Sequence, residues 1–491
     1  MTEQHSSEAR LIRCVMSREG RKSVGFGSDM VAGFSISESL ESPFMGGALT
    51  VSDSKNLINE YPIQGGETID IELKTSFSDI PIEYSFMIAK IGIRVIKNKT
   101  QVYDLLLCSP EALVNESIRV QDPLEGNPEA IVKKMLGKEY LNSTKELFSE
   151  PSRIEVKLNP AKIRPFDIIA KIIKRSVSSK TTYTGKKYKT YEENRQNRPN
   201  SNSKPIKGSA GFLFWETRRG YNFFSIDALC DTSENGTFIF KDKKKGDKKE
   251  KPRLQAESWG PYVEKIANTE ISGDQRFLIT KATFTSEIDI VGSLRKGKYS
   301  SLMIFFNIST GQYEEYTYQI KDSYDNMAHL GYQDSVAKIP NNEKGDLSES
   351  PSRIMSVLLD HESWYNEPGI ANPDDAKATD PNKFADWQKY YASQGVARAE
   401  LLYNQELTLD IPGNPEVCAG DKIDIRIQSK LADEQRKREP YDLESSGVYL
   451  VKTVNHMYNA LNTENGTLKT TLGLCRDSYG VAEVPSNHGN K

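Results

Sequence analysis

Two short stretches far apart in the chain share one pattern. Residues 66–73 read GETIDIEL, and residues 420–427 read GDKIDIRI. In each stretch a glycine and an acidic residue precede isoleucine or leucine at every second position. This alternation is typical of a strand with one buried face and one solvated face. The sequence therefore predicts two related strands, one near each end of the chain.

The residues that follow these two stretches also correspond. Residues 86–93 and 449–457 are strand-like, and each is followed by a turn and a closing strand that contains a cysteine, Cys108 in one case and Cys475 in the other. Equivalent positions favour both cysteines as small buried apolar groups. A single eight-residue match could arise by chance, but an ordered series predicts a duplicated β-barrel or sandwich module.

Length and composition exclude several classes of protein. A chain of 491 residues has room for about three domains. We expect no membrane-spanning segment, because such a segment needs about 20 mainly apolar residues and the apolar runs here are short. The first 20 residues contain no apolar stretch typical of a signal peptide. The balance of 65 Lys+Arg against 68 Asp+Glu disfavours a general nucleic-acid binder.

The sequence offers little material for catalysis or metal binding. The five cysteines are scattered, odd in number and never spaced as a metal knuckle or redox pair, which favours reduced thiols in a cytoplasm. There are five histidines, and His361 has no second histidine at helical spacing. The acidic pairs at 314–315 and 374–375 point to opposite faces of a strand. We therefore expect no catalytic, cofactor-binding or metal-binding residues and no cofactor.

Most of the chain consists of short strand-like segments separated by turn residues, with few helical patterns. Helices are expected at residues 127–136, 165–175 and 383–402, where apolar residues recur at helical spacing. Residues 174–198 and 241–251 are rich in lysine and arginine, which favours solvated loops. The alternative for these loops is a docking arm for an acidic partner surface or for nucleic acid.

Five segments of the sequence resemble a known family. Residues 34–40 (FSISESL), 47–53 (GALTVSD) and 61–67 (YPIQGGE) are similar to the start of baseplate hub proteins from contractile phage tails of the T-even type. Residues 210–229 resemble the central strand pair of that family, and residues 447–478 resemble its closing strands. The family is related to the hub part of type VI secretion spike proteins.

The resemblance implies a mainly β fold with minor α content. Two duplicated tube-like β-barrel domains would be interleaved in sequence, and peripheral β-rich or mixed domains would lie outside them. Mapped onto this chain, the resemblance assigns residues 1–110 with 206–232 to the first barrel. The second barrel receives residues 111–205 with 398–480, which include the helix at 165–175 and the basic loop at 174–198. Residues 233–397 are peripheral, with 302–306 as the core of a small β-rich domain, and residues 481–491 form a flexible tail.

The resemblance also implies a structural role without enzymatic activity. Hubs of this family are homotrimers, and their pseudo-six-fold ring joins the hexameric tail tube to the three-fold central spike and forms part of the DNA channel. The expected partners are the tail tube or tube-initiator ring, the central spike protein and the baseplate wedge proteins. Genomic DNA would pass through without specific binding. The expected location is the baseplate of the virion, after assembly in the host cytoplasm.

Three alternatives stay open at this point. The chain could be a hub or spike component of a related contractile injection or secretion system, which would need the same ring. It could be a tail-associated cell-wall hydrolase, although no acid/base pair supports this function. It could also capture nucleic acid through the loop at residues 241–251.

Overall fold

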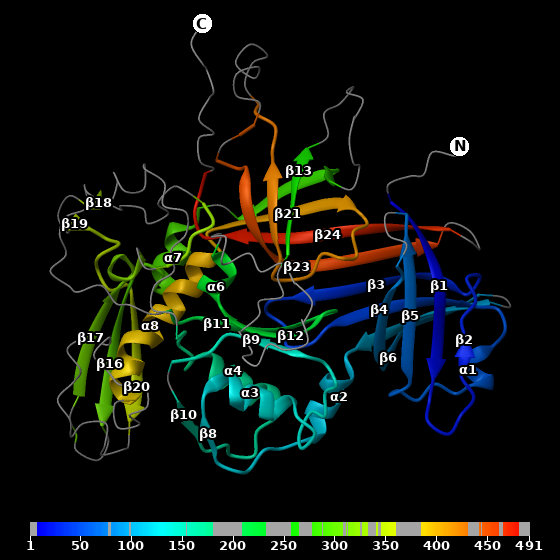
Figure 1. Ribbon diagram of the computed structural model, residues 1–491, viewed down its shortest axis with the longest axis horizontal. Coiled ribbons are helices and arrows are strands. Elements are labelled where there is room, and N and C mark those ends of the chain that lie inside the picture. The colour runs from blue at the N-terminus through cyan, green and yellow to red at the C-terminus, as the bar shows by residue number, and fades with distance from the viewer. Residues whose placement is uncertain are drawn as a thin grey trace, which may run out of the picture.

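The computed structural model describes the greater part of the chain, and all structural statements concern that part. The described residues are 7–76, 80–97, 100–153, 155–179, 209–231, 257–264, 277–286, 288–307, 311, 313–324, 327–331, 340–341, 345–359, 384–430, 441–442, 444–460 and 465–480. The fold is mainly β with few helices, as the sequence predicts (Figure 1). No helix among these residues is long and apolar enough to cross a membrane.

A first barrel-like unit, called copy 1, is built from residues 8–108. Its strands hydrogen-bond in the order β1-β5-β6-β7-β4-β3, and their inward side chains alternate with exposed ones. The short β2 (Val24–Gly25) pairs with β1, and α1 (Leu57–Glu60) follows β4. The six main strands are β1 (Glu8–Ser17), β3 (Val31–Ser39), β4 (Gly46–Asp53), β5 (Thr68–Thr75), β6 (Ile82–Lys97) and β7 (Thr100–Cys108).

A second unit, called copy 2, repeats this order near the other end of the chain. Its strands run β13-β22-β23-β24-β21-β15, so both copies have the order first, fourth, fifth, sixth, third, second when strands are counted along the chain. One difference is that β13 is parallel to β22, whereas β1 is antiparallel to β5. The strands are β13 (Ser258–Glu264), β15 (Lys281–Ser286), β21 (Gln405–Pro412), β22 (Lys422–Arg426), β23 (Gly447–Ala460) and β24 (Gly466–Arg476), and the short β14 (Leu278–Ile279) pairs with β13 in parallel.

Strand register confirms the predicted duplication at the level of single residues. In each copy, the strand that begins after the glycine-acid pair is paired with the next strand along the chain. That second strand is paired in turn with the strand that contains the matched cysteine. The matched rows are Thr68, Met87 and Cys108 in copy 1 and Lys422, Leu450 and Cys475 in copy 2. Both cysteines are buried, and all five cysteines of the chain are free thiols.

The two copies share one 14-stranded sheet rather than standing apart. Strand β23 of copy 2 pairs with β3 of copy 1 from Thr453 to Asn459, and β1 pairs with the start of β24. Strands β21, β24, β23, β3 and β4 therefore lie one below another across the middle of Figure 1. Continuous hydrogen bonding fixes the position of one copy relative to the other.

A small middle unit lies below this sheet in Figure 1 and has its own core. Helix α4 packs Phe166, Ile169 and Ile172 against aromatic residues of β11 and β12, and a proline begins each of α2, α3 and α4. Its elements are α2 (Pro110–Ser117), β8 (Leu124–Gly126), α3 (Pro128–Leu136), β9 (Leu147–Ser149), β10 (Val156–Leu158), α4 (Pro165–Ile173), β11 (Phe212–Thr217), β12 (Gly220–Ser225) and α6 (Ile226–Cys230).

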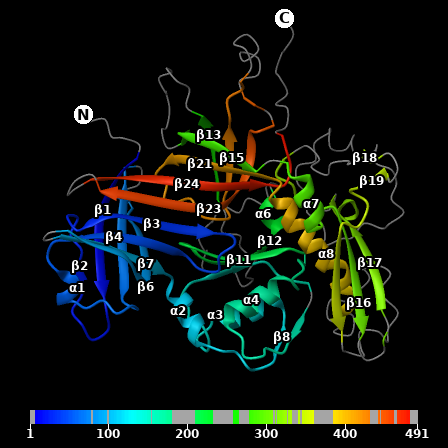
Figure 2. The ribbon, with the colours of Figure 1, turned by 180° about the vertical axis from the view of Figure 1, so that it is seen from behind.

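A peripheral unit is inserted between β15 and β21 of copy 2. Its sheet has the order β17-β16-β20 and lies beside α8, at one side of the molecule (Figures 1 and 2). The prediction of a core at residues 302–306 is only partly right, because Met303 is buried but Phe306 is exposed. The elements are α7 (Ile290–Lys296), β16 (Ser300–Asn307), β17 (Tyr313–Gln319), the 3-10 turn η2 (Ile320–Asp322), β18 (Pro340–Asn341), β19 (Gly345–Asp346), β20 (Arg353–Leu359) and α8 (Phe384–Leu402).

The structure differs from the predicted domain boundaries in three places. Residues 111–205, assigned to the second barrel, supply helices and short strands of the middle unit, because their apolar side chains pack into the separate core of that unit. Residues 206–232, assigned to the first barrel, supply β11 and β12, and β12 instead pairs with β9 of the middle unit, because its aromatic side chains complete that core. Residues 233–397, assigned to the periphery, supply β13 and β15, which are two strands of copy 2. Copy 1 is thus continuous in sequence, and copy 2 is the interrupted one.

The three predicted helices are present as α3, α4 and α8. Of the basic stretch at 174–198, only residues 174–179 belong to the described part, and the stretch at 241–251 and the tail at 481–491 lie outside it.

Candidate assembly surface

One exposed face of the shared sheet extends across both copies. Opposite residues on adjacent strands point to the same side, so Asp410, Thr471, Asn455 and Ser37 form one row across four strands. The other side of the same strands is the buried core. We call this exposed side the polar face; it includes Ser35, Ser37, Ala48, Thr50, Thr283, Thr408, Asn455, Met457, Asn459, Thr467, Lys469 and Thr471.

Charges on the polar face are paired across strands. The Asp410 carboxylate accepts hydrogen bonds from Lys469 Nζ and Thr471 Oγ1, both at 2.8 Å. Partial burial alone would raise the pKa of Asp410, but the bonds from Lys469 and Thr471 outweigh it and lower this pKa. Near copy 1, Thr50 donates to Asp104 at 2.7 Å. The face is hydrophilic without a strong excess of either charge.

A buried glutamate joins three parts of the chain at one end of β3. Glu38 accepts hydrogen bonds from the backbone N–H of Arg218 in the β11–β12 turn and of Ala419 in copy 2, each at 2.9 Å. Burial raises the pKa of Glu38 to about 7, although these two N–H groups act in the opposite direction. Copy 1, copy 2 and the middle unit therefore meet at this carboxyl group.

Asp421, the acidic residue of the GDKIDIRI stretch, organises the same junction from copy 2. Its carboxylate pairs with the Arg219 guanidinium at 2.8 and 3.1 Å and accepts hydrogen bonds from Trp259 Nε1 and from the backbone N–H of Glu257 and Cys418. Because Asp421 is fully buried, the partners replace the water that the charge would otherwise need.

The equivalent acid in copy 1 has a more local set of partners. Glu67 is also fully buried, and it accepts from the backbone N–H groups of Gln64 and Gly65 and pairs with Arg18 at 3.3 Å. Glu67 Oε1 and Asp421 Oδ2 each accept the N–H of the residue three positions earlier. The two acids thus hold the same turn in both copies.

A second buried ion network attaches the peripheral unit. Arg398 of α8 bonds Asp227 of α6 at 2.7 Å and Asp477, just after β24, at 3.2 Å. His329 Nδ1 lies 2.8 Å from the same Asp477 carboxylate. Burial alone would raise the pKa of Asp477, but His329 and Arg398 hold it well below its ordinary range. Truncating Arg398 would leave two buried carboxylates without their common partner.

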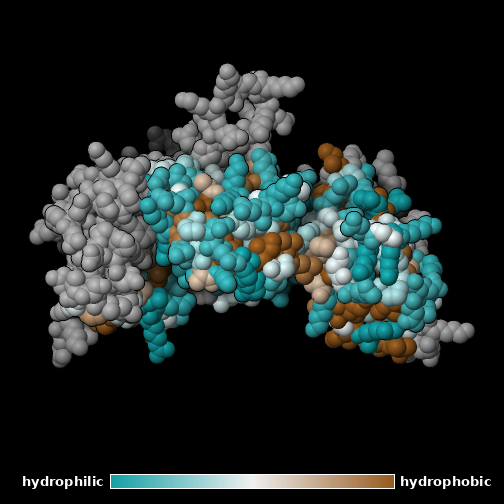
Figure 3. Space-filling view, turned by 90° about the horizontal axis from the view of Figure 1, so that it is seen from below, coloured by the Kyte–Doolittle hydropathy of each residue, from teal (hydrophilic) through white to brown (hydrophobic). Residues whose placement is uncertain are grey.

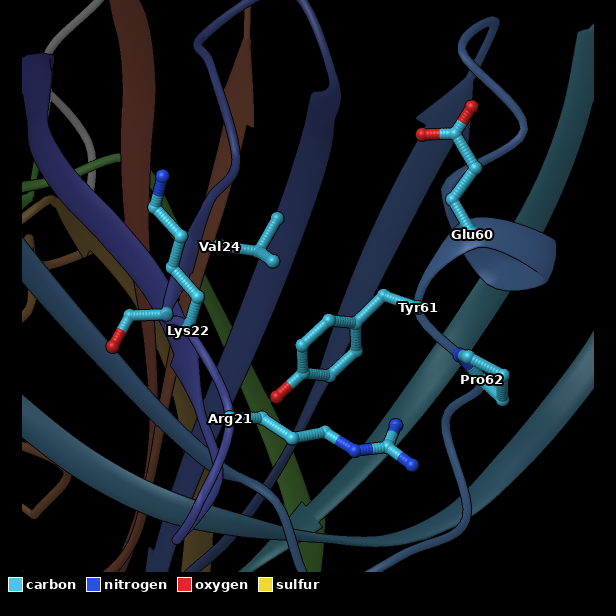
Figure 4. Close-up of a pocket in the computed structure, with 7 residues that line it drawn as sticks. Arg21, Lys22, Val24, Glu60, Tyr61 and Pro62 are labelled. Carbon is cyan, nitrogen blue, oxygen red and sulfur yellow. The ribbon is translucent and has the colours of Figure 1, made fainter.

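A shallow pocket of about 450 Å³ lies at the β1–β2 turn of copy 1 (Figure 4). The Arg21 guanidinium lies 5.5 Å from the centre of the Tyr61 ring. The pocket combines Arg21 and Lys22 with Glu60 and the side chains of Val24 and Pro62, and it contains no pairing of a nucleophile with a base.

The described histidine, cysteine and acidic side chains do not form a catalytic or metal-binding cluster. Within the described ranges, no group of three or more His, Cys, Asp and Glu side chains could hold a metal ion. Glu315 is exposed on β17, while His361 and the pair at 374–375 lie outside the described residues. Burial raises the pKa of Cys14 to about 12 and that of Cys418 well above its ordinary value, so neither is an activated thiol.

Sequence reasoning missed both buried networks, because ion pairs between distant segments leave no periodic pattern. The available signals were weak. Arg218 and Arg219 stand together at a tight turn, and Arg398 interrupts the apolar side of a helix.

Comparison of the structure with solved structures finds matches to tail proteins and to a chain of a PdpA-VgrG complex. The tail protein from Neisseria meningitidis is 11% identical over 94% of this chain and 97% of its own, with a TM-score of 0.46. The 43 kDa tail protein of prophage MuSo2 from Shewanella oneidensis is 9% identical over 96% and 99%, with a TM-score of 0.43. A chain of the Francisella PdpA-VgrG complex is 10% identical over 97% of this chain and 54% of its own, with a TM-score of 0.45.

No protein-family model matches the sequence, and no curated protein sequence does.

Proposed function

We propose that this chain is the structural baseplate hub of a contractile tail. Three copies form a ring of six barrels, which joins a six-fold tail tube to a three-fold central spike. The observation that carries the proposal is the duplication: two units with one strand order and one register share a continuous sheet. A trimer of such a chain presents six similar units, so it can meet a six-fold partner.

The polar face supports a second part of the proposal, the lining of a DNA channel. Serine, threonine and asparagine side chains dominate this face, and Lys469 is paired with Asp410. Retention of DNA requires many unpaired basic groups, which neutralise phosphates and thereby release counterions from the DNA. A surface of this kind lets DNA pass without specific binding. The proposed partners are the tube ring, the central spike and the wedge proteins of a virion baseplate assembled in the host cytoplasm.

The proposal includes the absence of catalysis, so the chain acts by shape and contact. The same ring would serve a contractile injection or secretion system, and the geometry of the chain supports both settings equally.

Two measurements test the function. Light scattering on the purified chain should give the mass of a trimer, and electron microscopy should show rings with six lobes. A stable monomer at high concentration, without association when tube or spike protein is added, would contradict the proposal. A mobility-shift assay with duplex DNA at low salt should show no retention, and a salt-dependent shift would contradict the neutral channel.

A further inference from the structure

The β6–β7 hairpin of copy 1 extends beyond its own unit and carries apolar residues in water. Ile93, Val95 and Ile96 are 75%, 57% and 67% exposed, and Val102 on β7 is 40% exposed. Earlier in β6, buried and exposed residues alternate, but residues 93–96 are all exposed, so both sides of the strand face solvent there. We call residues 90–97 with Val102 the β6 tip. Isolated exposed hydrophobic residues are common, whereas a cluster of this kind marks a contact surface.

The β6 tip is also an open sheet edge. Strand β5 pairs with β6 only from Ile82 to Met87, and Ile88 bonds Gly66 and Glu67. Beyond that point, β7 is the one described strand that pairs with residues 90–97. An exposed apolar edge strand offers a row of backbone N–H and C=O groups to another chain.

A second open edge lies on copy 2. Among the described strands, β15 pairs with β21 alone. Directly after it, Ile288, Ile290 and Val291 are 75%, 37% and 59% exposed at the start of α7. We call the free edge of β15 with these three residues the α7 shoulder. In Figure 1, α7 lies toward the left of the molecule and β6 toward the right, so one chain cannot bring the two surfaces together.

The two surfaces match in apolar character and differ in charge. Residues 90–97 include Lys90, Arg94 and Lys97 and no acidic residue. Asp289 is exposed among the apolar residues of the α7 shoulder. From below, hydrophobic residues gather along the lower edge of the part that contains copy 1 (Figure 3). A basic apolar edge on one side therefore matches, on the other side, an apolar edge whose exposed acid Asp289 is balanced by the exposed Lys281 of β15, so the match is chiefly apolar.

We propose that the β6 tip of one chain docks on the α7 shoulder of a second copy of the same chain. This inference rests on the proposed function, and it names the contact that closes the ring. The contact is heterologous, because a copy 1 surface meets a copy 2 surface, and repeated heterologous contacts close into a ring when the rotation permits. The barrels then alternate around the ring as copy 1, copy 2, copy 1.

Two double variants and their mixture test the contact. Ile93→Asp with Ile96→Asp disables the β6 tip, and Ile288→Asp with Val291→Asp disables the α7 shoulder. All four side chains are exposed, so the variants should fold, which circular dichroism verifies. We expect each variant to raise the dissociation constant of the ring by roughly a hundredfold or more, because two isoleucine-sized contacts become buried acids. Ile354→Asp, at an exposed apolar residue on β20 of the peripheral unit, should leave assembly unchanged.

The mixture distinguishes this contact from any other. A tip-disabled chain retains its shoulder and a shoulder-disabled chain retains its tip, so equal amounts should form a one-to-one dimer in native mass spectrometry. Variants that still form the wild-type ring, or a mixture that stays monomeric, would overturn the proposed contact and leave the hub function standing. A wild-type chain that never assembles would instead overturn the ring itself.

Discussion

The two barrel copies share their strand order, but they differ in how they connect to the rest of the chain. Copy 1 is continuous, and residues 40–45 are all that separates β3 from β4. In copy 2 the corresponding connection, between β15 and β21, contains the whole peripheral unit. A loop between neighbouring strands can grow in this way because its two ends stay close together and the closure entropy rises slowly with length. Additions to the fold have therefore entered copy 2 and spared copy 1.

The acidic residues of the two repeats show the same contrast. Glu67 binds its own turn and Arg18, all within copy 1. Asp421 holds its own turn through Cys418 but also binds Arg219 of the middle unit and Trp259 on β13. The same turn thus has a local role in copy 1 and anchors several units in copy 2.

The largest expected difference in stability between matched variants of the two copies comes from replacing these two acidic residues. Asp421→Ala should lower the free energy of unfolding by about 3–5 kcal/mol, because the Arg219 guanidinium, whose side chain is only 9% exposed, and several N–H groups lose their partner. Glu67→Ala should cost about 1–3 kcal/mol, since its partners are two turn N–H groups and a partly exposed arginine. Denaturant unfolding measures both. Equal losses would contradict the anchoring role of Asp421.

Core positions at matched registers should respond alike in the two copies. Leu105 faces Leu49 and Ile91, and Leu472 faces Leu409 and Val454, and both leucines are fully buried. Leu105→Ala and Leu472→Ala should therefore each cost about 3 kcal/mol. Native-state hydrogen exchange locates the loss, which should fall on the mutated copy first. A clear inequality between the two variants would indicate that the copies have diverged in packing as well as in connection.

Gly66 and Gly420, which begin the two repeated stretches, should differ in how much stability is lost when each is replaced by alanine. Both have positive φ, +80° at Gly66 and +95° at Gly420. A Cβ at Gly66 would meet no atom within 4 Å, whereas at Gly420 it would lie 2.7 Å from the Trp215 ring. We expect about 1–2 kcal/mol for Gly66→Ala from backbone strain alone and about 2–4 kcal/mol for Gly420→Ala. Trp215 fluorescence should shift in the second variant only.

The repeats and helices could be predicted because they depend on local patterns. Alternating Ile69, Ile71 and Leu73 are all buried on β5, and the periodic helix at 165–175 is α4. The assignment of β11 and β12 could not be predicted, since their aromatic residues suit the core of either neighbour. The partners Arg398 and Asp477 are 79 residues apart, and no local rule connects them.

The surfaces proposed for assembly could not be predicted from local sequence patterns either. Ile93, Val95 and Ile96 read as ordinary strand residues in the sequence, and their exposure follows from β5 ending before it reaches them. The polar face depends on the register of six strands, and no single stretch of sequence contains that information.

The smallest net effect on the stability of the whole chain concerns acid sensitivity, because two sites contribute with opposite signs. Burial and the nearby Arg218 lower the pKa of His456, on β23 of copy 2, to about 3. The unfolded chain therefore binds a proton near pH 6.5 that the folded chain excludes, and stability falls as pH drops below 6.5. The loss should reach about 2 kcal/mol at pH 5, at about 1.4 kcal/mol for each pH unit.

Glu38 of copy 1 has the opposite effect on stability as the pH falls. Its folded pKa of about 7 exceeds the ordinary value of 4.5, so its contribution is present below pH 4.5 and is lost as pH rises toward 7. The two effects partly cancel in the whole chain, and single variants separate them. His456→Gln should flatten the decline in stability between pH 6.5 and 5, whereas Glu38→Gln should steepen it, because the compensating gain is lost. Parallel pH profiles for wild type and both variants would show that neither group is linked to folding, and the contrast between the copies would then be one of connection alone.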